Sequence, residues 1–144
     1  MRISDVLQSK GPNVTTLDAG ATVRDLVEVL GERRIGAVIV SSSDRSLAGM
    51  VSERDVVRQL QLQADRLLDQ PVASIMTADV VVCASRDSVD TVLQLMTERR
   101  IRHVPVVDDG EIVGIVSIGD LVKSRIDELR LERDQLTNYI SGSA

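Results

Sequence analysis

The residues best suited to bind a ligand are a serine and an aspartate three positions apart, a spacing that occurs twice. The two copies are Ser52 with Asp55 and Ser117 with Asp120. A carboxylate accepts two hydrogen bonds, which suits the 2′- and 3′-hydroxyls of a ribose. The same spacing is typical of a capping box, in which the serine caps a helix and the acidic residue bonds back to the backbone. The sequence leaves both interpretations open.

A second candidate is the segment Arg102-His103-Val104-Pro105. Arg102 and His103 can meet a phosphate, and the histidine does so best when it is protonated, near its ordinary pKa of about 6.5. The main-chain groups of an exposed strand can bind the edge of an adenine, while the side chains of Val104 and Ile39 pack against its two faces. The plainer alternative is a surface arginine beside a half-buried histidine.

Two single residues extend this set. Arg54 lies in the first turn of the helix predicted after Ser52, where its planar guanidinium can reach a phosphate, whereas the second copy has Gly119 there. The alternative for Arg54 is a surface salt bridge with a neighbouring acidic residue. We expect Thr77 either as a hydroxyl contact at the mouth of a cavity around Asp120 or as a turn residue.

Composition excludes several other classes of function. The 144 residues carry a net charge of −5 and one aromatic residue, Tyr139, so no surface suits nucleic acid. No stretch approaches the roughly 18 apolar residues of a membrane span, and no signal-peptide pattern is present, so a cytoplasmic location is expected. A single cysteine, Cys83, and a single histidine cannot form a zinc site. No nucleophile with an orienting base can be assigned, so the sequence predicts no enzyme.

The chain repeats itself with a shift of about 66 residues, and such a period indicates an internal duplication. Glu32-Arg33-Arg34-Ile35 returns as Glu98-Arg99-Arg100-Ile101, and Gly49-Met50-Val51-Ser52 returns as Gly114-Ile115-Val116-Ser117. The opening Ser4-Asp5-Val6-Leu7 is similar to Ala73-Ser74-Ile75-Met76.

Each repeat predicts the order β-α-β-β-α. Apolar spacing after Thr22 and Ser88 predicts capped helices over residues 23–34 and 89–100, and further helices begin at Ser52 and Ser117. Asp108-Asp109-Gly110 is typical of a tight hairpin, whereas residues 41–46 are expected as a loose turn. The predicted strands are residues 14–17, 37–40 and 47–51 in the first repeat and 80–83, 103–107 and 112–116 in the second.

Two halves of about 65 residues are each too small to bury a full core, so we expect them to pack as one pseudo-symmetric pair. The expected units are residues 1–66, residues 67–125 and a helical extension over residues 126–144. The last helix carries an apolar stripe that two repeats cannot cover, so we expect it in a homodimer interface. Folding of the stripe back over the first repeat is the alternative. Its members are Val122, Ile126, Leu129, Leu136 and Ile140.

The segment from Ile75 to Leu121 resembles a CBS motif, named after the regulatory domain of cystathionine β-synthase. The resemblance is carried by Ile-Met-Thr, then a strand and a helix, then RRIRHVPVVDDGEIVGIVS and Asp-Leu. The first repeat resembles the motif less closely, and together the two cover roughly residues 1–125. The resemblance implies an α/β fold of two tandem CBS repeats, called a Bateman module, of the stand-alone bacterial type.

Such pairs bind adenosine-containing ligands between the repeats, act as energy or redox sensors and are usually dimers. The resemblance puts Asp55 and Asp120 at the ribose position and pairs Arg102 and His103 with Asp55. Gly36 and Ala37 stand at the matching positions of the first repeat, so the Asp120 cleft is expected to be poorer in phosphate donors.

AMP is the expected ligand, followed by ADP, ATP or NAD(H), with S-adenosylmethionine less favoured. An unknown regulated protein partner would respond to the bound ligand. The alternative from another class is a structural interaction protein whose clefts stay empty and whose C-terminal helix docks a partner.

Overall fold

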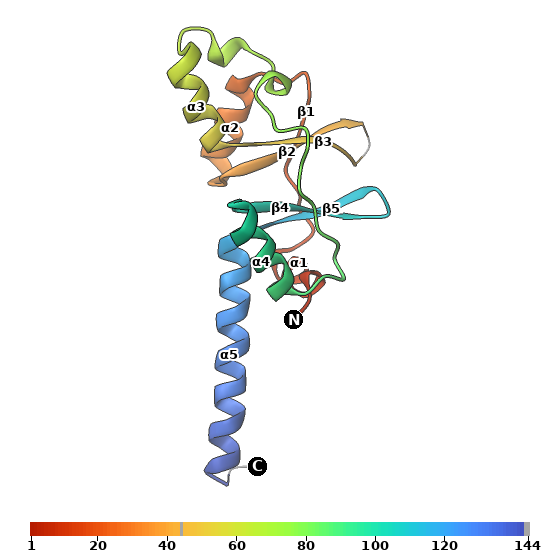
Figure 1. Ribbon diagram of the computed structural model, residues 1–144, viewed down its shortest axis with the longest axis vertical. Helices are drawn as coiled ribbons and strands as arrows, with labels where there is room; N and C mark the ends of the chain where they lie inside the picture. The colour runs from red at the N-terminus through yellow and green to blue at the C-terminus, as the bar shows by residue number, and fades with distance from the viewer. Residues whose placement is uncertain (44, 143–144) are drawn as a thin grey trace.

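Two small sheets face one another at the centre of the structure, a computed structural model that describes residues 1–43 and 45–142 (Figure 1). In the first sheet, β2 (Ala37–Ser43) lies between β1 (Thr16–Asp18) and β3 (Ser46–Ser52). It pairs parallel to β1 and antiparallel to β3. The second sheet is the antiparallel pair β4 (His103–Asp108) and β5 (Glu111–Ser117).

Helices cover the outer face of each sheet. Figure 1 shows α2 (Val23–Arg33) and α3 (Glu53–Gln63) outside the first sheet. It shows α1 (Ile3–Lys10), α4 (Val89–Arg99) and the beginning of α5 (Ile118–Ile140) outside the second. The short 3-10 turns η1 (Leu67–Asp69) and η2 (Val72–Ser74) begin the connection between the two halves.

The leading segments of the two repeats are exchanged between two aliphatic cores. Ile3 and Val6 of α1 pack in the core under the second sheet, with residues such as Met96 and Leu121. Leu67, Val72 and Ile75, which precede the second helix–sheet unit, pack in the core under the first sheet. Each half therefore completes the core of the other, which explains why neither repeat is large enough alone.

Glycines make room for this exchange at matching positions of the two repeats. A Cβ on Gly114 would come within 2.5 Å of the Leu7 Cδ2 atom, which belongs to α1. A Cβ on Gly49 would come within 2.7 Å of the Thr77 carbonyl oxygen. The crossing segments thus lie directly against β3 and β5.

Most predicted elements are present, within a few residues of the expected bounds. The hairpin between β4 and β5 turns at Asp109 and Gly110, whose φ angles of 51° and 80° suit a two-residue type I′ turn. The strands of the first hairpin are longer than expected, because β2 runs to Ser43 and β3 begins at Ser46, although their register shifts between Val40 and Ser43. Residue 44 of the predicted loose turn lies outside the described residues.

Two predictions at the repeat starts are wrong or incomplete. The strand predicted over residues 80–83 does not form, and only Cys83 pairs with β4. Its N–H donates to the Pro105 carbonyl at 3.0 Å, and its carbonyl accepts from the Val107 N–H at 2.9 Å. The helix α1 was not predicted, because only two of its residues, Ile3 and Val6, are buried and carry an apolar signal.

Cys83 is buried in the core of the second half. Burial raises its pKa to about 12, with smaller contributions from the carboxylates of Asp87 and Asp108. The thiol is therefore protonated at neutral pH, which suits a side chain that packs as an apolar group.

Helix α5 extends well beyond the body of the protein (Figure 1). Leu121 is buried, whereas the stripe from Val122 to Ile140 is exposed to between 43% and 75%. The alternative in which this stripe folds back over the first repeat is wrong, because the distal turns point away from both sheets. Within the described residues, no helix is long and apolar enough to cross a membrane.

Candidate functional site

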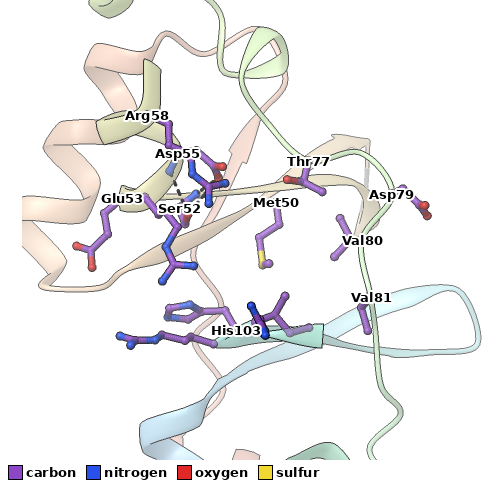
Figure 2. Close-up of a pocket in the computed structure, with 14 residues that line it drawn as sticks. Met50, Ser52, Glu53, Asp55, Arg58, Thr77, Asp79, Val80, Val81 and His103 are labelled. Atoms are coloured by element: carbon purple, nitrogen blue, oxygen red, sulfur yellow. Dashed lines mark hydrogen bonds between the residues drawn. The ribbon is translucent and has the colours of Figure 1, made fainter. Parts of the chain in front are cut away.

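A cavity of about 310 Å³ opens between the two halves, beside the beginning of α3. Figure 2 shows Ser52, Asp55 and Arg58 on one side of it, His103 of β4 opposite, and Val80 and Val81 of the connecting segment along a third side. The volume lies at the lower end of the roughly 300–1,000 Å³ common for small-molecule sites. The lining residues are Met50, Ser52, Glu53, Arg54, Asp55, Arg58, Thr77, Asp79, Val80, Val81, Arg100, Ile101, Arg102 and His103.

Asp55 is held at the first turn of α3 by a capping box with Ser52. The Ser52 N–H and hydroxyl donate to the Asp55 Oδ2 atom at 2.8 and 3.1 Å, and the Asp55 N–H donates to the Ser52 Oγ atom at 3.3 Å. The capping interpretation of the Ser-x-x-Asp pattern is therefore confirmed. It does not exclude ligand binding, because Asp55 lines the cavity and these bonds use Oδ2, which leaves Oδ1 as an acceptor.

Four arginines are among the residues that line this cavity, against the carboxylates of Glu53, Asp55 and Asp79. Arg54 and Arg102 were predicted here from the sequence, whereas Arg58 and Arg100 were not. Arg58 lies one turn after Arg54 on α3, so the two share a face of the helix. The four-residue spacing of these arginines was the signal available for Arg58.

Arg100 ends α4 in the left-handed conformation, with a φ of 54°, which places it where β4 begins. Arg34 ends α2 in the same way, with a φ of 53°. A left-handed arginine is an uncommon choice, and strained backbone of this kind gathers at functional sites. Both residues are the second arginine of the repeated Glu-Arg-Arg-Ile pattern, which was the sequence signal available for Arg100.

Thr77 lies in the Asp55 cavity, so its predicted place at the mouth of the Asp120 cavity is wrong. The reason is the crossing of the connecting segment onto β3. The Met50 N–H donates to the Thr77 carbonyl at 2.9 Å, and the Thr77 N–H donates to the Met50 carbonyl at the same distance. Figure 2 shows both side chains beside the cavity.

The predicted packing of Val104 against a base is also wrong. Val104 is fully buried in the core of the second half, and neither it nor Pro105 is among the cavity-lining residues. Alternation along β4 points His103 toward the cavity and Val104 into the core. Ile39 is likewise fully buried. The apolar lining comes instead from Met50, Val80, Val81 and Ile101.

His103 lies between the two halves, against Gly36. A Cβ on Gly36 would come within 3.3 Å of the His103 ring, so the glycine makes room for the imidazole. Burial lowers the pKa of His103 below its ordinary value of 6.5, and the charge of Lys10 lowers it further. Asp120 and Glu53 raise the pKa, and Arg102 lowers it, by smaller amounts. In the ligand-free protein the imidazole therefore gains its proton only at a lower pH than an ordinary histidine does.

Lowering the pH should destabilise the ligand-free protein through His103. Because the folded-state pKa is depressed, the stability that the neutral ring contributes is present above about pH 6.5 and is lost as the pH falls through that value toward the folded-state pKa. Between about pH 7.5 and pH 5 we expect the melting temperature to fall further in the native chain than in His103→Gln. Thermal unfolding followed by circular dichroism measures this, and an equal fall in both proteins would contradict it.

Ser117 and Asp120 form the matching capping box at the beginning of α5. The Ser117 N–H donates to the Asp120 Oδ2 atom at 2.9 Å, and the Asp120 N–H donates to the Ser117 Oγ atom at 3.1 Å. Asp120 also pairs with Lys10, a residue that the sequence analysis did not select, whose Nζ atom lies 2.7 Å from Oδ2. Burial raises the pKa of Asp120, but hydrogen bonds from Lys10 and Ser117 outweigh it and hold the pKa below its ordinary value.

The sequence pattern of the CBS domain matches residues 3–62 and 72–127. The chain belongs to the CBS domain family. Its α/β fold of two tandem CBS repeats with a long C-terminal helix, predicted from the sequence, is confirmed. Among curated proteins, the chain is 36% identical over 151 residues to the mitochondrial CBS domain-containing protein CBSX3 of Arabidopsis thaliana, covering 97% of this chain and 72% of that one.

Solved structures of other CBS proteins are similar in both fold and sequence. A CBS-domain containing protein from Agrobacterium tumefaciens is 37% identical with a TM-score of 0.82, over 86% of this chain and 92% of that one. A CBS domain protein from Pyrobaculum aerophilum, solved in complex with AMP, is 32% identical with a TM-score of 0.78, over 92% of this chain and 99% of that one.

Proposed function

We propose that this CBS pair is a regulatory module that binds an adenine nucleotide in the cavity beside Asp55 and acts as an energy or redox sensor. The observation that carries the proposal is the meeting, in one cavity, of a capped aspartate from the first repeat with Arg102 and His103 from the second. A ligand that touches both repeats can change their relative orientation, and a regulated partner would respond to that change.

The chemistry of the lining suggests a place for each part of a nucleotide. Asp55, with Oδ1 outside the capping box, would accept the two hydroxyls of a ribose. Met50, Val80 and Val81 supply apolar contacts for an adenine ring. The arginines of α3 and of the segment before β4 would pair with phosphate, to which a guanidinium binds through two parallel hydrogen bonds.

AMP is the first choice of ligand, and the AMP complex of the related Pyrobaculum aerophilum protein supports it. ADP, ATP and NAD(H) follow, because four arginines can neutralise more than one phosphate group. S-adenosylmethionine is less favoured, since its sulfonium cation would lie where the cavity is already rich in positive charge. We propose the cytoplasm as the location of this module.

Calorimetry with AMP, ADP, ATP, NAD(H), S-adenosylmethionine and adenosine tests the proposal. We expect saturable binding of AMP that adenosine reproduces only weakly, since adenosine makes no use of the arginines. Thermal unfolding with each compound gives an independent readout, because a ligand that binds only the folded state raises the melting temperature. Neither heat nor a thermal shift with any compound would favour the alternative, an interaction protein with empty clefts.

We also propose that the chain forms a homodimer through its helical faces. Besides the exposed stripe of α5, Val57 of α3 is 65% exposed, and it is the counterpart of Val122 in the first repeat. A second copy of the chain supplies the same face, and a two-fold axis is the commonest way to close such an assembly. The near-heptad spacing of Val122, Leu129 and Leu136 suits packing along another helix.

A further inference from the structure

Asp55 and Asp120, the two aspartates at the proposed ribose positions, have different neighbours. The shift that aligns residues 4–7 with residues 73–76 aligns Lys10 with Asp79, so the repeat has a cation beside Asp120, whereas the corresponding residue in the lining of the Asp55 cavity is an anion. Lys10 is the last residue of α1, and its Nζ atom donates to the Asp120 Oδ2 atom at 2.7 Å. The same ammonium donates to the Ile115 carbonyl at 2.8 Å.

The corresponding groups of the first repeat are satisfied differently. The Met50 carbonyl, counterpart of the Ile115 carbonyl, accepts the main-chain N–H of Thr77 at 2.9 Å. Asp55 bonds only to Ser52 within the described part of the chain, and it faces the open cavity. One repeat therefore presents an accessible carboxylate, while the carboxylate of the other is neutralised by the chain itself.

We propose that Lys10 is an internal latch that occupies the ribose position of the Asp120 cleft and limits the chain to one bound nucleoside, at Asp55. This inference rests on the proposed function. A latch of this kind makes the two ribose positions unequal, although each repeat has an aspartate there.

The balance of interactions favours the lysine over a ribose. Two neutral hydroxyls would have to displace an ammonium, so an ion pair in which both partners are charged would be exchanged for hydrogen bonds in which only the Asp120 carboxylate is charged. The Ile115 carbonyl would also lose a donor. A nucleotide gains little in return at this cleft, because Gly119, Gly36 and Ala37 stand where the Asp55 cavity has Arg54, Arg102 and His103.

The ion pair between Lys10 and Asp120 can also open, because it lies near the surface. The side chains of Lys10 and Asp120 are 37% and 26% exposed, so solvent ions reach the pair. Salt therefore weakens this contact, as it does other exposed ion pairs.

Removing the latch should raise the number of AMP molecules bound per chain. Calorimetry with AMP is expected to give one site for the native chain and two for Lys10→Ala. Arg24→Ala is the matched control, since Arg24 forms an exposed ion pair with Asp69 at 3.5 Å, away from the cavity lining. This control should still bind one AMP.

Double substitutions assign the second site to one aspartate. They also separate the proposed latch from the proposed nucleotide binding at Asp55. Lys10→Ala with Asp120→Ala should return to one AMP, and Lys10→Ala with Asp55→Ala should keep one AMP at Asp120. Thermal unfolding confirms that each variant is folded. Two AMP molecules on the native chain, or a single one on Lys10→Ala, would overturn the latch while leaving binding at Asp55 intact.

The remaining outcomes concern a native chain that binds no AMP. If Lys10→Ala then binds one AMP that depends on Asp120, the latch is supported and the proposed function at Asp55 fails. If neither protein binds AMP at millimolar concentration, both proposals are overturned.

Discussion

Asp55→Ala is expected to weaken AMP binding by about 10- to 100-fold, whereas Asp120→Ala leaves it nearly unchanged. Hydrogen bonds to a charged group contribute about 1.5–3 kcal/mol, and about 1.4 kcal/mol corresponds to a factor of ten in affinity. Asp55 lines the cavity that holds Arg54, Arg102 and His103, whereas Asp120 is paired with Lys10.

Each of the two alanine variants is a control for the loss of the helix cap in the other. Each is the third residue of a helix and closes a capping box with a serine, so both alanine variants lose a cap, and Asp120→Ala loses the ion pair with Lys10 as well. Calorimetry gives the affinities, and the melting temperature of each ligand-free variant reports the loss of the cap. Equal weakening by the two substitutions, or greater weakening by Asp120→Ala, would show that our ranking of the clefts is wrong.

Truncation of the chain before Leu129 is expected to convert the proposed homodimer largely to monomer. The removed turns carry Leu129, Leu136 and Ile140, which are 48%, 59% and 75% exposed in the single chain. Burial of such side chains against a second copy supplies roughly 25 cal/mol for each Å² of apolar surface. The truncation keeps Glu128, which pairs with the N-terminal amine at 3.7 Å and with Arg125 at 3.1 Å, so the base of α5 stays anchored.

Light scattering at several concentrations measures the change in mass. A chain shortened after Ile140 is the matched control, because it loses only the polar tail and should stay dimeric. Arg133 interrupts the stripe, so we expect a short helical contact and no extended coiled coil. A fully dimeric protein after truncation before Leu129 would show that surfaces of the body hold the dimer, and a monomeric full-length chain would contradict the dimer itself.

Local patterns in the sequence predicted most of the fold. Caps at Thr22, Ser52, Ser88 and Ser117 begin helices where expected, because capping depends on a few neighbouring residues. The Asp109-Gly110 turn was predictable for the same reason. The internal repeat gave the order of elements in each half, although it suggested a strand over residues 80–83 that does not form.

The errors arise where distant segments meet. Nothing near Thr77 indicates that it lies against β3 beside Asp55, since this contact depends on the crossing of the connecting segment. Lys10 and Asp120 are 110 positions apart, so their pairing is not visible in any local pattern. The lowered pKa of His103 also depends on packing between the halves, because burial is its largest cause.

The exchange of leading segments also sets an order for folding during synthesis. No residue of the first core comes after Met76, so that half can close as soon as the connecting segment has left the ribosome. Helix α1 is made before the other described elements, yet it contributes Ile3 and Val6 to a core that extends to Leu121. Its apolar side chains have no native partner until most of the chain has been translated. Helix α1 is therefore synthesised early but packs into its core late.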